Sequence, residues 1–217
     1  MITPATRERF LREESGFTLV EMMITTVIMI IMLFALYSIF DMSLRIVSFG
    51  NNKVEAVESA RLGLDKMERE IRQAYAFDRA NGNMLRFETW TPTQIRFGND
   101  LDGNGIIECP NTGTPPQCEK IGYQIYETPA GSGNYALGRD NSSTGTTNTV
   151  ANLQPVVEHA TNTGLSFEYF EGDGTTPAGS ETDIGVVRIE LTITVAKGLK
   201  DATQTLTTDV ALRNRGG

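Results

Sequence analysis

The apolar pattern at the start of the chain is long and almost unbroken. From Phe17 to Phe40 nearly every side chain is apolar, and Glu21 is the only formally charged residue. As an α-helix rising about 1.5 Å per residue, this run is about 36 Å long and can cross a bilayer core of about 30 Å. The sequence therefore predicts a transmembrane helix over residues 17–40.

Beyond this run the helical pattern continues but becomes one-sided. No proline occurs between Phe17 and Phe77, and a chain of apolar or small residues recurs at steps of three or four: Val54, Val57, Ala60, Leu64, Met67, Ile71 and Ala74. Such spacing is typical of a helix with one apolar stripe. We expect one long helix over 17–76, whose second half lays this stripe on another layer of structure.

After residue 77 the pattern changes, and apolar residues recur at every second position. Alternation covers six segments: 85–89, 94–97, 121–125, 165–169, 187–195 and 206–212. It indicates antiparallel strands with one buried face. Arg96 falls among the polar positions of its segment, and the polar stretches 128–152 and 172–183 are predicted as surface loops. The predicted fold class is α+β, with the long helix laid across the antiparallel sheet of a globular head over 77–217.

Composition and charge exclude several classes of function. The chain has 19 Lys and Arg against 27 Asp and Glu, a net charge of −8, and no basic tract, so it lacks the electrostatic footprint of a nucleic-acid-binding protein. None of the common motifs of hydrolases, phosphate-binding loops or dinucleotide-binding enzymes is present, and we expect no enzymatic activity. One His and two Cys leave little for a metal cage built from those residues.

A short charged leader precedes the apolar run. Residues 1–16 hold three Arg and three Glu and end in Gly16, and the junction reads G-F-T-L-V-E, from Gly16 to Glu21. The leader, the junction, the glutamate and the apolar run together resemble the type IV prepilin signature. The resemblance implies cleavage between Gly16 and Phe17 by prepilin peptidase, N-methylation of Phe17, and retention of the helix. A cleaved secretory signal differs, because its apolar stretch is shorter and ends at a small-residue cleavage site.

Glu21 is the fifth residue of the chain that this cleavage would leave. A carboxylate within a spanning helix costs about 2.5–3.5 kcal/mol on insertion scales, so such a residue is a functional candidate. In pilins the glutamate at this position is thought to neutralise the α-amine of a neighbouring subunit during assembly, which would fix the axial register. The alternative is a tolerated glutamate in a simple membrane anchor.

Two further segments suggest which kind of pilin the chain resembles. Many major pilins have a proline near the middle of the apolar helix, and this sequence has none there. Residues 60–77 resemble the corresponding segment of minor pilins of the PilW type and of type II secretion pseudopilin J. The implied function is a minor pilin that helps to initiate assembly at the fibre tip. A pseudopilin J-like subunit is the alternative, and a single-span membrane-anchored binding domain is the alternative of another class.

The resemblance also implies partners and a location. The partners would be prepilin peptidase, other minor and major pilins or pseudopilins, and inner-membrane lipid. The chain would sit in the bacterial inner membrane with its head in the periplasm, and would then enter a pilus or pseudopilus.

An acidic loop offers a candidate calcium site. Asp100, Asp102 and Asn104 place oxygen side chains at alternating positions, Ile106 would add a backbone carbonyl, and Glu108 would add a carboxylate. The twelfth position of this loop is an asparagine, where the EF-hand pattern has a glutamate. The alternative is a tight turn rich in Asp, Asn and Gly between two strands.

Cys109 and Cys118 are the only cysteines and lie nine positions apart. Since the head would enter an oxidising compartment, a disulfide is the favoured interpretation. Free thiols and a shared metal are the alternatives.

Overall fold

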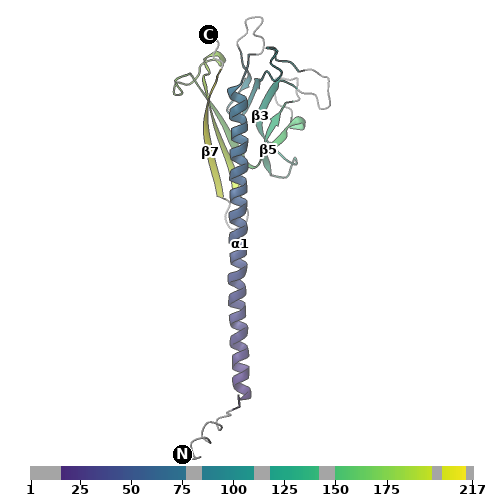
Figure 1. Cartoon of the computed structure of the whole chain (residues 1–217), viewed down its shortest axis with the longest axis vertical. Coiled ribbons are helices and arrows are strands. Elements are labelled where there is room, and N and C mark those ends of the chain that lie inside the picture. The colour runs from purple at the N-terminus through teal and green to yellow at the C-terminus, as the bar shows by residue number, and fades with distance from the viewer. Residues whose placement is uncertain (1–15, 77–84, 110–117, 142–149, 197–201, 214–217) are drawn as a thin grey trace, which may run out of the picture. The chain divides into compact units, whose positions relative to one another are not determined.

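The computed structural model describes residues 16–76, 85–109, 118–141, 150–196 and 202–213 (Figure 1). Contacts divide the chain into two compact units, 1–48 and 49–217, which are described separately. The leader predicted over 1–16 lies outside the described residues except for Gly16.

One helix, α1 (Leu19–Arg72), runs from the first unit into the second. It ends earlier than the predicted residue 76 because the chain turns to join the sheet. Tyr75 forms an isolated antiparallel bridge with Gly98, and its N–H donates to the Gly98 carbonyl at 2.9 Å.

The second unit contains one seven-stranded sheet in which every strand pairs antiparallel with the next along the chain. Its strands are β1 (Phe87–Trp90), β2 (Gln94–Gly98), β3 (Lys120–Glu127), β4 (Tyr135–Asp140), β5 (Gln154–Phe170), β6 (Val186–Ala196) and β7 (Ala202–Ala211). Two short 3-10 turns, η3 (Val150–Asn152) and η4 (Glu181–Asp183), lie between strands. The predicted α+β class is confirmed: a long N-terminal helix packs on a curled antiparallel sheet, which is a pilin-like fold.

The core of the second unit lies between the sheet and the apolar stripe of α1. Ala60, Met67 and Ile71 are fully buried against side chains from the sheet. The stripe begins two positions later than expected, since Ala56 is buried while Val54 is 64% exposed. The predicted stripe is therefore right from Ala60 onward and wrong at its first residue.

Gly63 allows α1 to approach the sheet closely. A Cβ added there would overlap the Cγ2 atom of Val157 in β5, whereas one added at Gly50 would meet nothing within 4 Å. The two glycines therefore differ in role: Gly63 is a packing residue, and only Gly50 stands in open space.

Two sequence predictions about the sheet are wrong. β4 lies inside the stretch 128–152 that was predicted as a loop. Arg96, expected on the solvent face of β2, has a side chain that is fully buried and ion-paired with Glu88 and Asp140. The side of β2 that carries Arg96 is therefore buried, and the charge of Arg96 is balanced by the carboxylates of Glu88 and Asp140.

Candidate functional site

The start of α1 is capped by a side chain of the junction. The hydroxyl oxygen of Thr18 accepts the backbone N–H of Glu21 at 3.2 Å, which satisfies one of the N–H groups that a helix leaves unpaired in its first turn. Thr18 and Glu21 have the spacing of a capping box. An acid in the first turn also interacts favourably with the positive end of the helix dipole. The junction thus fixes where the helix begins and places Glu21 in its first turn.

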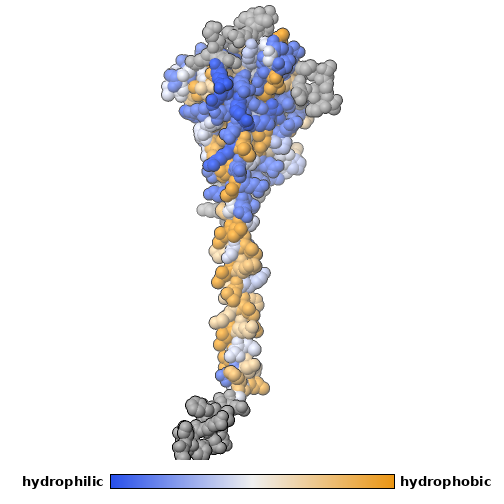
Figure 2. Space-filling model, in the orientation of Figure 1, coloured by the Kyte–Doolittle hydropathy of each residue, from blue (hydrophilic) through white to orange (hydrophobic). Residues whose placement is uncertain are grey.

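The apolar half of α1 exposes its side chains on all sides. Phe17 and Leu19 are each 76% exposed, and none of the most apolar part of the helix is buried within the chain. Figure 2 shows hydrophobic surface along this half. The helix is long and apolar enough to cross a membrane. Such a surface is stable in lipid or against other apolar helices, and not in water.

Charged side chains occur again beyond Phe40. Asp41 and Arg45 form an ion pair one helical turn apart, with Nε and Oδ2 separated by 2.9 Å. Glu21, in contrast, has no cationic partner among the described residues. A cation for the Glu21 carboxylate must therefore come from outside the described part of the chain.

Residues 11–37 match the family model for the prokaryotic N-terminal methylation motif. This motif is typical of type IV pilins and pseudopilins, and it stands here at the start of a pilin-like fold. The chain therefore combines a prepilin-type methylation motif with a pilin-like fold. The match implies processing by prepilin peptidase, anchoring in the inner membrane and assembly with other pilin-like subunits. No curated protein and no solved structure matches this chain.

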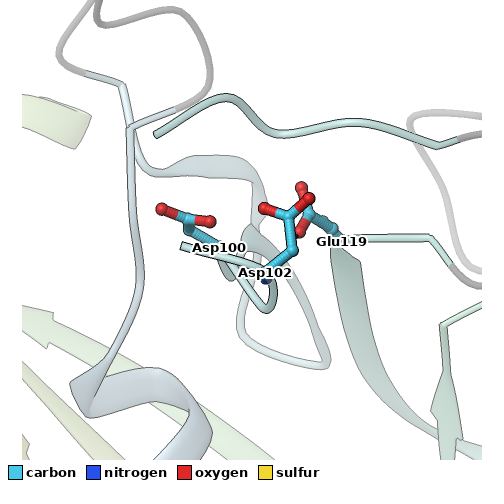
Figure 3. A group of neighbouring side chains, drawn as sticks. All are labelled: Asp100, Asp102 and Glu119. Carbon is cyan, nitrogen blue, oxygen red and sulfur yellow. Dashed lines mark hydrogen bonds between the residues drawn. The ribbon is translucent and has the colours of Figure 1, made fainter. Parts of the chain in front are cut away.

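The acidic loop of the head brings together a different set of carboxylates from the predicted one. Asp100 and Asp102 follow β2, and Glu119 directly precedes β3; oxygens of the three lie within 4.8 Å of one another (Figure 3). The third member of this cluster, Glu119, is a carboxylate that the predicted ligand set did not include. Sequence spacing missed Glu119 because it lies seventeen positions beyond Asp102 and reaches the loop through the antiparallel pairing of β2 with β3.

Glu119 holds the two ends of the acidic loop together. Its Oε1 accepts the N–H groups of Leu101 and Asp102 at 3.0 and 3.3 Å, and its Oε2 accepts the N–H of Glu108 at 3.0 Å. The Glu119 side chain is also largely buried. Its carboxylate thus acts as a clip between the start and the end of the loop.

The other acids satisfy the turn itself. Asp100 accepts the N–H groups of Gly103 and Gly105 at 2.7 and 3.0 Å, and both glycines have positive φ, 79° and 81°, which favours glycine. The Oδ1 atom of Asn104 accepts the N–H of Ile106 at 2.7 Å. These contacts form the tight turn that was the alternative to a calcium site. The remaining carboxylate lone pairs could still bind a hard cation, so calcium stays a prediction of the sequence.

The two cysteines form a disulfide. Cys109 and Cys118 are bonded and enclose 110–117, which lies outside the described residues. Next to the bond, the N–H of Glu119 donates to the carbonyl of Glu108 at 2.9 Å. The covalent link therefore joins the end of the acidic loop to Cys118, the residue directly before Glu119.

Two buried polar networks in the head were not anticipated from the sequence. In the first, Glu88 pairs with Arg96 at 3.1 Å and with Lys120 at 2.6 Å. In the second, the Tyr123 hydroxyl donates to Glu70 at 2.6 Å, and Arg139 pairs with the same carboxylate at 3.0 Å.

Burial, and then the Glu70 carboxylate, raises the pKa of Tyr123 far above its usual value, so the phenol stays neutral and donates its proton. Tyr123 and Arg139 together connect β3 and β4 to Glu70 of α1. This network holds the helix on the sheet and supplies no reactive group.

Proposed function

We propose that this chain is a minor type IV pilin that helps to initiate pilus assembly at the fibre tip. The observation that carries the proposal is the setting of Glu21. Glu21 is the fifth residue after the proposed cleavage bond. Its carboxylate stands in an otherwise apolar helical surface, with no cation beside it in the described part of the chain. That arrangement is suited to a partner supplied by another subunit.

The proposed sequence of events begins with the leader. Prepilin peptidase removes residues 1–16, and Phe17 gains a free α-amine that is then methylated. The helix over 17–40 holds the subunit in the inner membrane while the head over 77–217 stays in the periplasm. An unpaired charge in an apolar setting is costly, and pairing with an opposite charge offsets that cost. The Glu21 carboxylate of one subunit and the α-amine of the next would therefore fix their register while apolar packing supplies the attraction.

Two sequence features support a minor subunit over the bulk subunit of the fibre. The apolar part of α1 contains no proline and is an uninterrupted helix. The segment 60–77 resembles that of PilW-type minor pilins, and its residues form the stripe that packs on the sheet. Under this proposal the protein is present in few copies per fibre, which quantitative mass spectrometry of sheared pili measures directly.

Substitution of Glu21 tests the role of its charge. We expect Glu21→Ala and Glu21→Gln to be cleaved normally but to enter pili at least about tenfold less well, because breaking an ion pair in an apolar setting costs about 3–5 kcal/mol. Glu21→Asp keeps the charge and should retain much of the wild-type incorporation. If Glu21→Gln enters pili as well as the wild type, the charge has no role in assembly.

A type II secretion pseudopilin is the second candidate, because it would use the same leader, helix and glutamate. Deletion of the gene separates the two: loss of surface pili supports the minor pilin, and loss of protein secretion with normal pili supports the pseudopilin. A single-span anchored binding domain predicts neither phenotype and an uncleaved leader.

A further inference from the structure

The acidic loop contains an asparagine followed directly by a glycine, Asn104 and Gly105. In such a pair the backbone nitrogen of the glycine can attack the side-chain amide of the asparagine, because glycine has no Cβ to block the approach. The Asn104 side chain is exposed, so water can reach the product of that attack. The loop therefore holds a nucleophile and an electrophile on neighbouring residues.

Each atom that would take part in this attack already has a hydrogen-bond partner in the loop. The N–H of Gly105, the nucleophile, donates to Asp100 Oδ2 at 3.0 Å. The Asn104 Oδ1 atom, which would carry the negative charge, accepts the N–H of Ile106 at 2.7 Å. The leaving nitrogen, Asn104 Nδ2, donates to Asp102 Oδ2 at 2.9 Å. A base, an oxyanion donor and an acceptor for the leaving group thus surround one amide.

We propose that Asn104 converts itself to aspartate and isoaspartate through a cyclic imide formed with Gly105, and that the acidic loop catalyses this step. The Gly105 nitrogen bonds to Cγ of Asn104 and passes its proton to the Asp100 carboxylate. The bond from Cγ to Nδ2 then breaks, and Nδ2 takes up that proton and leaves as ammonia. Water, the co-reactant, opens the ring at either carbonyl carbon and leaves aspartate or isoaspartate at position 104.

A second turn of the head has similar geometry but a different acceptor for the glycine proton. In the pair Asp173 and Gly174, the Asp173 Oδ1 atom accepts the N–H of Thr175, two residues on, at 2.9 Å. Gly174 has a φ of 73°, close to the 81° of Gly105, and both glycines are half-buried. The N–H of Gly174, however, donates to the backbone carbonyl of Glu171 at 3.0 Å. A carbonyl oxygen is a far weaker base than a carboxylate, so this turn is a natural comparison for the acidic loop.

The reaction would change both the charge and the backbone of the loop. The neutral amide of Asn104 becomes a carboxylate, and its hydrogen bond to Asp102 is replaced by repulsion between two negative groups. The isoaspartate product also adds one carbon to the main chain at this position. We therefore expect aged subunits to carry one more negative charge and a looser turn than newly folded ones.

The test uses the full-length Asp173→Asn variant in detergent, with a chelator so that no divalent cation occupies the carboxylates. This substitution creates an asparagine–glycine pair in the second turn and keeps the oxygen that accepts the N–H of Thr175. Peptide mass spectrometry follows the change from amide to acid at both positions, on protein that unfolds at the wild-type temperature. We expect position 104 to convert at least about tenfold faster than position 173, which is below the about 10²–10⁴-fold typical of positioned acid–base groups because Asp100 is a weak base. Equal rates, or a slower rate at position 104, would overturn the proposal.

A second variant tests the base directly. Asp100→Asn keeps the size of the side chain and one acceptor oxygen but removes the charge, and should slow conversion of Asn104 at least about tenfold. Faster conversion would mean that the bond from Gly105 to Asp100 protects Asn104, and the proposal would be wrong. If Asp100→Asn lowers the melting temperature, the comparison of positions 104 and 173 in the other variant still decides. None of these outcomes bears on the role proposed for Glu21.

Discussion

The two halves of α1 share one backbone conformation and have opposite surface chemistry. In residues 19–48 the large apolar side chains stay exposed, and none of the apolar window is buried. In residues 49–72 the apolar side chains form one stripe, and Ala60, Met67 and Ile71 are fully buried. The difference shows that helicity alone does not define a role: the first half needs lipid or other helices around it, whereas the second half needs the sheet of its own chain.

A charge placed in the first half should have the largest effect. We expect Ile30→Lys to raise the free energy of membrane insertion by about 2.5–3.5 kcal/mol, because an ammonium group at the centre of a spanning helix is poorly solvated. A glycosylation-based insertion assay measures this quantity. Val54→Lys is the matched control, since Val54 is an apolar residue 64% exposed in the second half. Equal insertion free energies for both variants would show that the halves do not differ in environment.

A methyl group placed in the second half should have a smaller effect. Gly63→Ala forces a Cβ onto Val157, and we expect a net loss of about 1–2 kcal/mol, since overpacking outweighs the gain in helix propensity. Gly50→Ala adds the same atom in open space and should not lower stability. Thermal unfolding of the full-length protein in detergent gives both values. A Gly63→Ala variant as stable as Gly50→Ala would mean that the close approach of α1 to β5 is wrong.

Calcium is expected to have the smallest effect, confined to the head. If the loop binds Ca²⁺ as the sequence predicts, a free Ca²⁺ concentration of ten times the dissociation constant should raise the free energy of unfolding by about 1.4 kcal/mol. Calorimetry should record binding heat for the wild type and less for Asp102→Asn, because Asp102 is the exposed member of the carboxylate cluster. The absence of both heat and a shift in melting temperature would leave the loop as a structural turn.

How far the sequence predicted the structure depends on whether the information was local. The apolar run after Phe17, the periodic stripe from Ala60 to Ile71, and the alternating strands are local patterns, and each element is confirmed.

The predictions failed where the environment of a side chain is set by residues far away in the sequence. Arg96 seemed solvent-facing by alternation, but Asp140, which is far along the chain, is its buried partner. Glu119 was missed because the pairing of β2 with β3 brings it beside Asp100 and Asp102. The packing role of Gly63 depends on Val157, which lies far along the chain in β5. No local pattern carries this information.

Mass spectrometry of the mature N-terminus, on protein recovered from cells, tests the central claim most directly. The account predicts a chain that begins at N-methylated Phe17 and retains the whole of α1. A chain that still begins at Met1, or one that starts beyond Phe40, would contradict it.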